Sequence, residues 1–580
     1  MLRIPSILFL LAAPSLALST QETGQAVAES PPEAPVDAAE ESGEEPAEEA
    51  STEAEEPSGP RLTTEADWQQ WERLGGATLS PDGRWAAYTI SRNDGTSELR
   101  LRVLATDSTE VFEEGRSPEF SSDGKWMAFS IGKSRAEAKK LSAKKQPVES
   151  KLGLFDLVRG ESSEVESVRN SEFSGDGLYL AMQHYAAKGD KNGSDVVIRE
   201  LATGTDTHFG RVTSFRWSDS GAWLAFTTGA PGQSGNGLRV FNAATGMLRT
   251  LDSAECDYVG MTWREDSADL AVMRKTSHED DEDATFEVMA WRNVAKAGTP
   301  PVVFDHLKDE QCPEELRVVE FNGLRWTDDG AALAFGLKEW KDRPASLDEE
   351  DAEEDTDGDA ESEDSAEGDG KEEEKEDAGK DKADSEPSPD ADKGKKESKG
   401  KSMRETLKKA PGVEIWHARD IQIVPRQKIT ARSDERETIA ALYWLDEKKL
   451  VQLENDVAES SSLLEGGRYA LGRDETPYEE EQRFSATVSD LYAIDAKTGS
   501  QEKILERVKY AITGDPKGRY ILFVRDGDIW SHDLEKDSSV NLTKDMDTAF
   551  INQENSSLTD EKPPYGVGGW TEDGRTVLLY

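Results

Sequence analysis

The closest approach to a serine-nucleophile motif in this sequence is the segment Gly232-Gln233-Ser234-Gly235-Asn236-Gly237. A Gly-x-Ser-x-Gly-Gly turn between a strand and a helix is strained, and it projects the serine hydroxyl toward a histidine base and an oxyanion hole. Here Asn236 stands where the second glycine is required, and the segment falls between two predicted strands. We interpret it as a flexible inter-strand loop, and the sequence predicts no catalytic residue.

Side chains that ligate metals are present, but their spacing is unsuitable. None of the histidines has the His-Glu-x-x-His spacing of a zinc site; they are His184, His208, His278, His306, His417 and His532. The acidic run from His278 to Asp283 is typical of a solvated loop, and the run from Asp355 to Asp359 has Ala360 where a calcium loop needs glycine. The sequence therefore predicts no metal site and no cofactor.

Phosphate-binding chemistry is not indicated either. Gly132-Lys133-Ser134 resembles the end of a phosphate loop, but Met127 occupies the position of its required upstream glycine. No basic stripe interleaved with aromatic residues is present, which disfavours binding to nucleic acid.

Cys256 and Cys312 are the two cysteines of the chain. In an oxidising compartment they could form a disulfide that closes a long loop. The sequence does not show whether their Cα atoms come close enough to pair. Two buried free thiols are the favoured alternative.

A repeated pattern of short apolar runs and turn residues extends along most of the chain. Residues 215–251 contain an aromatic run, the turn Ser218-Asp219-Ser220-Gly221, and three further strand-like runs. Runs of about five aromatic and β-branched residues between turn formers predict strands joined by tight turns. Four such strands make one antiparallel sheet.

The same unit recurs, and its early turn glycines are separated by 41, 53 and 44 residues, as in four-stranded propeller blades. Its turns begin near Ser80, Ser122, Gly175, Thr327, Asp515 and Thr571, with weaker copies at Trp263–Val272 and Tyr443–Leu453. The sequence predicts an all-β fold over residues 62–580, a β-propeller of about seven to eight four-stranded antiparallel blades. Tryptophans beside the turns are expected to pack between blades rather than to bind sugars; they are Trp85, Trp126, Trp217, Trp263 and Trp326.

The net charge of −50 is concentrated in two acidic tracts. Glu22 to Glu56 contains 13 acidic and no basic residues, and Asp348 to Glu397 contains 25 acidic and 7 basic residues. Tracts with so few large apolar side chains cannot bury enough surface to offset chain entropy. We therefore expect a disordered leader at 20–61 and a disordered insertion at 346–408, inside one blade.

The amino terminus has the layout of a secretory signal peptide. Arg3 precedes the apolar run Ile4 to Ala13, and small residues follow at Ala17 and Ser19. The sequence predicts a signal peptide at residues 1–19 and a periplasmic or secreted protein. No other apolar run is long enough to span a bilayer, so stable membrane insertion is not expected.

The Ser-Pro-Asp-Gly turn and the aromatic-rich strand after it resemble the propellers of the prolyl oligopeptidase family and of periplasmic TolB-like proteins. Val413-Glu414-Ile415-Trp416-His417, continuing to Arg419-Asp420 and Gln427-Lys428, resembles a segment of large exported bacterial members of the first family. Unit by unit, the resemblance spans residues 62–580.

In the prolyl oligopeptidase family, the propeller precedes an α/β-hydrolase domain and restricts access to its active site. The resemblance implies an exported propeller portion of a serine peptidase that gates or binds peptide substrate, with the hydrolase domain missing from this chain. Because the chain stops on the apolar strand Val577–Tyr580, we expect truncation of a longer protein. The alternative is a stand-alone periplasmic TolB-like propeller that binds a protein or cell-envelope partner.

Overall fold

The computed structural model describes residues 63–190, 192–221, 223–276, 284–340, 421–455, 457–482, 487–556 and 561–580. The predicted signal peptide, the leader and the 346–408 insertion lie outside these ranges. So do the 278–283 and 355–359 acidic runs, the Val413-to-Asp420 segment, and the histidines at 278 and 417.

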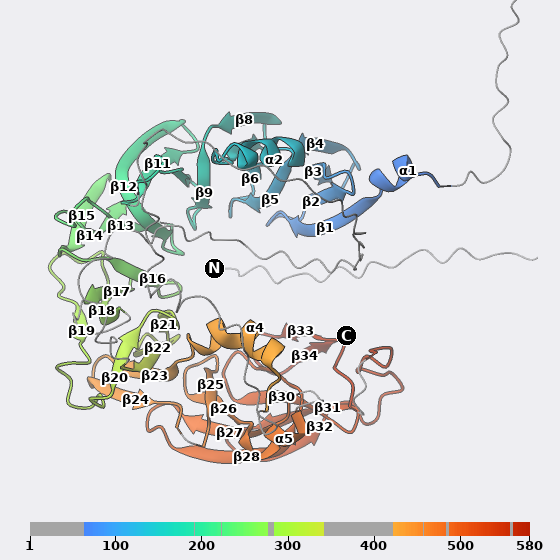
Figure 1. Ribbon diagram of the computed structural model, residues 1–580, viewed down its shortest axis with the longest axis vertical. Coiled ribbons are helices and arrows are strands. Elements are labelled where there is room, and N and C mark those ends of the chain that lie inside the picture. The colour runs from blue at the N-terminus through green and yellow to red at the C-terminus, as the bar shows by residue number, and fades with distance from the viewer. Residues whose placement is uncertain are drawn as a thin grey trace, which may run out of the picture.

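The described chain is an all-β propeller-like array in which every strand pair is antiparallel and consecutive strands are mostly neighbours. We number the blades in the order in which they occur along the chain. In each blade the first strand lies nearest the centre of the array and the last strand lies at its outer edge (Figure 1). Blade 1 contains β1 (Glu72–Leu79), β2 (Trp85–Arg92), β3 (Ser97–Val103) and β4 (Thr109–Glu113). Blade 2 contains β5 (Gly115–Phe120), β6 (Trp126–Ile131), β7 (Lys151–Asp156) and β8 (Glu161–Val165).

Blades 3 and 4 share one long strand, β12 (Thr205–Trp217), which joins them into a seven-stranded sheet. Blade 3 contains β9 (Val168–Phe173), β10 (Tyr179–His184), β11 (Ser194–Glu200) and the first part of β12. Blade 4 contains the rest of β12, β13 (Trp223–Thr228), β14 (Gly237–Asn242) and β15 (Met247–Asp252). Blade 5 contains β16 (Tyr258–Trp263), β17 (Leu270–Thr276), β18 (Thr285–Trp291) and β19 (Val302–Phe304).

In blade 6 the first strand is broken into β20 (Leu316–Val319) and β21 (Arg325–Trp326), and both pieces pair with β22 (Ala332–Glu339). Blade 6 continues with β23 (Ile439–Trp444) and β24 (Lys449–Gln452). Blade 7 contains β25 (Ser460–Leu463), β26 (Tyr469–Asp474), β27 (Ser489–Asp495) and β28 (Gln501–Val508). Blade 8 contains β29 (Ala511–Gly514), β30 (Tyr520–Arg525), β31 (Asp528–Asp533) and β32 (Ser538–Asn541), and half-blade 9 contains β33 (Val567–Trp570) and β34 (Val577–Leu579).

The predicted fold class is confirmed, with eight four-stranded blades and a two-stranded ninth unit. One predicted blade start is wrong. The weak copy at Tyr443–Leu453 is the hairpin between β23 and β24, inside blade 6. The first turn of blade 7 instead lies between β25 and β26, where Glu465-Gly466-Gly467 replaces the usual Asp-Gly pair. Both segments combine apolar runs with turn residues, so the pattern alone did not separate the first hairpin of a blade from its last.

The first turn of a blade has a recurring hydrogen-bond pattern. In blade 3 the Ser174 hydroxyl donates to the Asp176 carboxylate at 2.6 Å and accepts the N–H of Tyr179 at 2.9 Å. Gly177 closes this turn with a φ of 71°, which residues with a side chain rarely adopt. The same hydroxyl contacts recur in turns that begin at Ser80, Ser121, Thr327 and Thr571.

Seven apolar clusters fill the spaces between consecutive blades from blade 1 to blade 8. Between blades 4 and 5, for example, Trp223 and Val240 pack against Trp263 and Met289. Because a central blade is covered on both faces, its middle strands are apolar throughout, and β13 is buried along its whole length. The blade interfaces therefore make up the core of the molecule.

Three buried tryptophans also form hydrogen bonds across these interfaces. The indole N–H of Trp217 donates to the carbonyl of Glu172 at 3.2 Å, from the first strand of one blade to that of the preceding blade. Trp263 and Trp326 repeat the contact at 3.0 Å and 3.4 Å in the next two interfaces. Trp85 and Trp126 are partly buried against other clusters. The prediction that these tryptophans pack between blades is confirmed.

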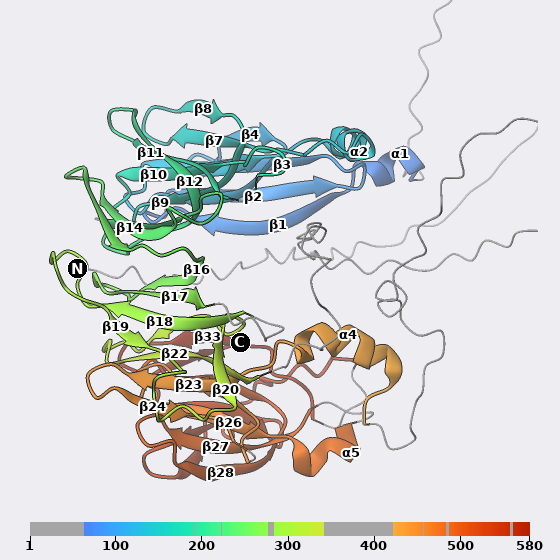
Figure 2. The ribbon, with the colours of Figure 1, turned by 60° about the vertical axis from the view of Figure 1, so that its left-hand side comes forward.

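The antiparallel meander gives the array two different faces. The first and third connections of each blade lie at one end of the strands, which we call the turn face, and most of them are tight turns. Second connections and the links between blades emerge at the other end, which we call the loop face. Helices α1 (Glu65–Gln69), α2 (Arg135–Ala143), α4 (Val424–Asp434) and α5 (Glu479–Gln482) all lie on that side (Figure 2). In the sequence, the predicted insertion falls between β22 and β23.

The two ends of the array differ from its middle. Every residue of β1 is exposed, and the described residues contain no apolar cluster that joins blade 1 to blade 8 or half-blade 9. Blade 1 and half-blade 9 lie at opposite ends of the arc of blades (Figure 1). Half-blade 9 packs on blade 8 through stacking of Trp570 on Tyr520, with ring centroids 6.4 Å apart.

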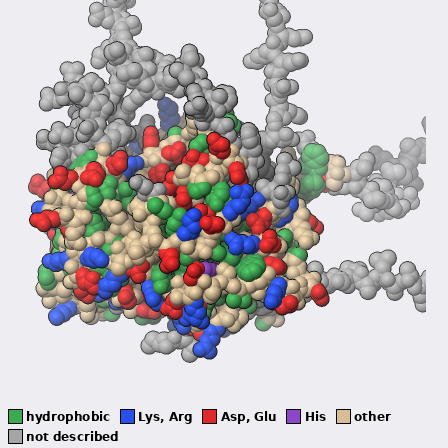
Figure 3. All heavy atoms as spheres, turned by 90° about the horizontal axis from the view of Figure 1, so that it is seen from below, with side chains coloured by type: hydrophobic (Ala, Val, Ile, Leu, Met, Phe, Trp, Pro, Cys, Tyr) green, Lys and Arg blue, Asp and Glu red, His purple; other side chains and the backbone are tan. Residues whose placement is uncertain are grey.

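The surface of the described part has mixed charge. On the face in Figure 3, acidic and basic side chains are interspersed and form no single-sign stripe. No helix in the described residues is long and apolar enough to cross a membrane.

Candidate functional site

A groove opens on the turn face between blades 2 and 3, and we call it the Trp126 groove. Its volume is about 270 Å³. It is lined by Trp126, Val158, Leu178, Leu201, Ala202, Gly177, Asp123, Lys125, Asp156 and Arg159. Four tight turns, two from each blade, therefore contribute to its walls.

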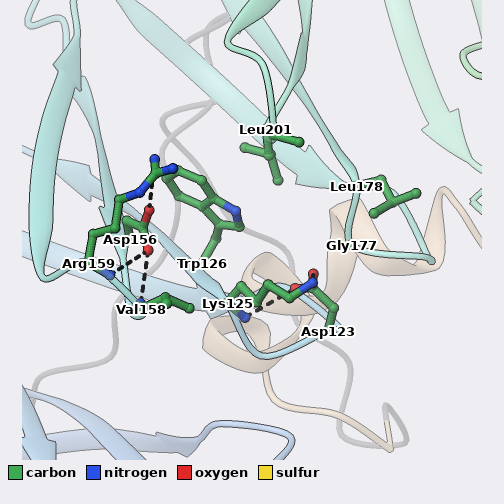
Figure 4. A pocket seen from close by; sticks show the side chains of 10 residues that line it. Asp123, Lys125, Trp126, Asp156, Val158, Arg159, Gly177, Leu178 and Leu201 are labelled. Atoms are coloured by element: carbon green, nitrogen blue, oxygen red, sulfur yellow. Dashed lines mark hydrogen bonds and ion pairs between the residues drawn. The ribbon is translucent and has the colours of Figure 1, made fainter.

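Apolar side chains form the centre of the Trp126 groove (Figure 4). Trp126 begins β6 and is partly buried, and Leu201 of blade 3 faces it and is buried. Val158 is 71% exposed and Leu178 is 48% exposed, although both are large apolar residues. Neighbouring exposed apolar side chains beside a tryptophan are typical of a site that binds another apolar side chain.

Two ion pairs border this apolar centre. Lys125 Nζ lies 2.9 Å from the Asp123 carboxylate, and Arg159 Nη1 lies 3.6 Å from the Asp156 carboxylate. Burial alone would raise the pKa of Asp123, but hydrogen bonds from Lys125 and Ser121 outweigh it and the pKa falls below its ordinary value. Both cations are more than half exposed, so they add little stability and are free to contact a ligand.

The geometry of the Trp126 groove suits the binding of a ligand. Asp123 and Asp156 are occupied as turn caps, because Asp123 accepts the N–H of Lys125 and Asp156 accepts those of Val158 and Arg159. The lining contains no serine, cysteine or histidine. The groove can hold one apolar side chain and contact its flanking backbone through exposed charges.

A second feature lies on the first strands of blades 3 and 4. The Glu172 carboxylate accepts the N–H of Trp217 at 3.3 Å, and the Trp217 indole donates to the Glu172 carbonyl. Burial raises the pKa of Glu172 to about 7. The Trp217 N–H and Arg216 act against this rise, and the carboxylates of Glu119 and Asp219 add to it. Glu172 is therefore a titratable group inside a blade interface.

The structure also brings together Ser539, His532 and Asp537 on the hairpin of β31 and β32. His532 Nδ1 lies 3.0 Å from the Ser539 hydroxyl, and its Nε2 lies 3.6 Å from the Asp537 carboxylate. Burial lowers the pKa of His532. Ser539 lies in an extended strand, where successive N–H groups point to opposite sides and cannot converge on one oxyanion.

We interpret the Ser539 and His532 contact as a structural cross-strand pair. The two residues are direct partners in the antiparallel ladder. Sequence reasoning missed this pair because it compared histidines with motif spacings. A prediction that strands 528–533 and 538–541 form a hairpin would have placed the two residues opposite each other.

The glycine-rich segment that most resembled a nucleophile motif is an inter-strand loop, as predicted. It connects β13 and β14, and Asn236 is buried within it. The Asn236 side chain accepts the N–H of Ala230 at 2.7 Å and donates to the carbonyl of Cys256 at 2.9 Å. Asn236 therefore ties this connection to the link between blades 4 and 5.

The candidate phosphate loop also has a structural role. The Ser134 hydroxyl caps α2 by accepting the N–H of Glu137 at 3.3 Å. A serine at this position satisfies one of the free donors at a helix start. The segment Gly132 to Ser134 therefore begins a surface helix on the loop face.

Both cysteines are free thiols, as the favoured alternative predicted, but only Cys312 is buried. Cys256 is half-buried at the interface of blades 4 and 5, and Cys312 is buried at the next interface. Burial raises the pKa of both thiols, that of Cys312 to about 11.

Of the described histidines, His184 and His208 lie in blade 3, His306 follows β19 of blade 5, and His532 lies in β31 of blade 8. His184 Nδ1 contacts the carbonyl of Ser167 at 3.1 Å, and the ring of buried His306 lies 5.6 Å from that of Trp340. Within the described residues, no group of three or more His, Cys, Asp or Glu side chains is arranged to hold a metal ion.

No protein-family model and no curated protein sequence matches the chain. Similar solved structures include TolB from Acinetobacter baumannii, with a TM-score of 0.21, 16% identity, and coverage of 38% of this chain and 52% of that chain. A structure from an analysis of two prolyl endopeptidases has a TM-score of 0.32, 12% identity, and coverage of 80% of this chain and 54% of that chain. The propeller domain of the Trilobed protease from Pyrococcus furiosus has a TM-score of 0.27, 14% identity, and coverage of 47% of this chain and 80% of that chain.

The chain spans about half the length of the TolB and prolyl endopeptidase chains. Because these TM-scores are low, we assign the propeller-like fold from the sheets described above and not from these similarities.

Proposed function

We propose that this chain is an exported, non-catalytic propeller that binds peptides and gates substrate for a serine peptidase of the prolyl oligopeptidase type. The Trp126 groove is the observation that carries the proposal. It combines an aromatic floor, two exposed apolar walls and exposed charges in a space suited to one side chain.

The peptide in this proposal is extended and carries a large apolar side chain. That side chain enters between Val158 and Leu178 and packs on Trp126. Lys125 and Arg159 lie on the rim, where they contact carbonyl or carboxylate oxygens of the peptide. The proposed selectivity is for one apolar anchor, with little dependence on the neighbouring residues.

A stand-alone periplasmic propeller of the TolB-like kind would use the same groove for a side chain of a folded partner. Reading the gene past codon 580 separates the two functions. A downstream frame that encodes Gly-x-Ser-x-Gly-Gly supports the peptidase, and a stop codon supports the stand-alone module.

Peptide binding is tested by a charge placed in the Trp126 groove. Peptides are selected on the purified chain from a random library, and their affinities are measured by isothermal titration calorimetry. Val158→Glu is expected to lower the affinity at least tenfold, because a buried ligand methylene group would then face a carboxylate. Val158 is largely exposed, so the variant is expected to fold.

Val540→Glu is the matched control, since Val540 is an exposed valine on the outer strand of blade 8. Its affinities are expected to equal those of the unmodified chain. An equal loss of peptide affinity in both variants, or no loss of affinity in Val158→Glu, rules out the Trp126 groove as the peptide site.

A further inference from the structure

A second groove, of about 350 Å³, lies on the loop face between the same two blades. The strands β5, β6 and β7 of blade 2 form one wall, and β9 of blade 3 forms the other. The polar side chains among its lining residues include Arg116, Arg169, Lys151, Glu119, Asn170 and Ser171. We call it the arginine groove.

Backbone irregularities set the positions of both arginines. In β5 the register with β6 shifts between Arg116 and Glu119, and Ser117 has a φ of 51°. In blade 3, Ser167 has a φ of 58° just before β9, where the register with β10 also shifts. Such bulges redirect side chains, and they recur next to binding sites.

The Arg116 guanidinium lies against the backbone of Gly132. A Cβ atom added to Gly132 would lie 1.8 Å from Arg116 Nη2. The absence of a side chain at Gly132 therefore leaves room for Arg116 to extend along the wall of the groove.

The pairing of the two arginines differs from that of Lys151 in the same groove. Within the described residues, neither Arg116 nor Arg169 forms an ion pair, and both are exposed. By contrast, Lys151 in the same groove pairs with Glu164 at 3.0 Å and Glu166 at 2.8 Å. Glu119 is the one carboxylate in the lining, and burial raises its pKa.

Some arginines elsewhere in the array pair with a carboxylate of their own blade. Arg199 pairs with Asp206 at 2.8 Å and Arg519 with Asp533 at 2.7 Å, in both cases within one blade. Two unpaired guanidinium groups from adjacent blades that face one cavity are therefore suited to an external anion.

We propose that the arginine groove binds a carboxylate group of a peptide ligand through Arg116 and Arg169. The planar fork of a guanidinium matches the two oxygens of a carboxylate, and the pair is strong because both groups are charged. Asn170 and Ser171 supply further hydrogen-bonding groups on the blade 3 wall. The carboxylate belongs to the peptide C-terminus or to an acidic side chain.

The experiment uses the full chain and three labelled peptides with one common sequence. The first has a free C-terminus and no acidic residue, the second is amidated and carries one glutamate, and the third is amidated and neutral. Fluorescence anisotropy at low and high salt measures their affinities. We expect the first or the second to bind at least about tenfold more tightly than the third, with weakening at high salt.

The double variant Arg116→Gln and Arg169→Gln is expected to remove this preference. Arg432→Gln is the control, because Arg432 is an exposed arginine of α4 on the loop face of blade 6. Preference for the first peptide assigns the groove to a C-terminal carboxylate, and preference for the second assigns it to an acidic side chain. Equal binding of all three peptides, or a preference that survives in the double variant, overturns the proposal.

This inference rests on the proposed function only in that the ligand is a peptide. The two can fail separately, because Val158→Glu and the arginine variants are measured with the same peptides. If Val158→Glu still prefers peptides with a carboxylate, the arginine groove remains supported even when the Trp126 groove is ruled out.

Discussion

At the scale of single residues, Glu172 and Trp217 link two blades by reciprocal hydrogen bonds. The carboxylate of Glu172 accepts a backbone N–H, and the indole returns a hydrogen bond to the Glu172 carbonyl. Burial raises the pKa of Glu172 to about 7, so this interface holds a carboxyl group that titrates near neutral pH. Its effect on stability follows from proton linkage.

Glu172→Gln is expected to change how stability depends on pH. Between the ordinary carboxyl pKa and about 7, the folded chain holds a proton on Glu172 that the unfolded chain has lost. The free energy of unfolding therefore falls as pH rises through this window. Melting temperatures should be measured from about pH 4 to about pH 8. At about pH 8 the glutamine variant should melt a few degrees above the unmodified chain, and this difference should close toward about pH 4.

Glu161→Gln in the exposed strand β8 is the control for this effect. It should follow the pH profile of the unmodified chain. A Glu172→Gln profile parallel to that of the unmodified chain at every pH contradicts the assigned pKa.

At the scale of elements, the blade turn is what the sequence predicts best. A hydroxyl, an aspartate and a glycine at fixed spacing form a local network that needs no partner from elsewhere in the chain. Ser174 illustrates this, since it is buried and its hydroxyl satisfies the N–H of Tyr179. The turn of blade 7, with glutamate and two glycines, lacks the aspartate and was missed for that reason.

Ser174→Ala is expected to destabilise the chain by about 1 to 3 kcal/mol, because the N–H of Tyr179 loses its acceptor in a buried turn. Ser162→Ala, in the exposed strand β8, is expected to have almost no effect. Chemical denaturation of both variants provides the comparison. Equal stability of the two would mean that the hydroxyl contributes nothing to the turn.

Neither groove could be predicted from the sequence. Trp126 and Leu201 are 75 residues apart in the chain and meet because blades 2 and 3 pack side by side. Trp126 was predicted to pack between blades, which is correct, but the pattern gave no indication that Val158 and Leu178 stay exposed beside it. Arg116 and Arg169 depend on bulges that no residue pattern specified.

At the scale of the whole molecule, the array has interfaces between all eight complete blades and two exposed ends. Every residue of β1 is exposed at one end, and at the other Leu578 and Tyr580 are about half exposed. Within the described residues, β34 pairs with β33 alone, so one of its edges is free. A free edge strand with apolar side chains favours pairing with another chain.

The purified chain is therefore expected to self-associate through β34. Sedimentation velocity at several concentrations should show a growing fraction of dimers or larger species. Leu578→Lys places a charge on this edge and is expected to restore the monomer. A monomer at every concentration in the unmodified chain contradicts this expectation and indicates that the edge is covered.

The central claim is that this propeller binds peptides in the Trp126 groove without cleaving them. The most direct measurement incubates the purified chain with a defined peptide mixture and identifies the retained and released peptides by mass spectrometry. We predict that retained peptides are intact and share one large apolar residue, and that Val158→Glu no longer retains them whereas Val540→Glu does. Cleavage products that appear with the chain and disappear in Ser539→Ala would contradict the non-catalytic assignment, and equal retention by both valine variants would contradict the assigned groove.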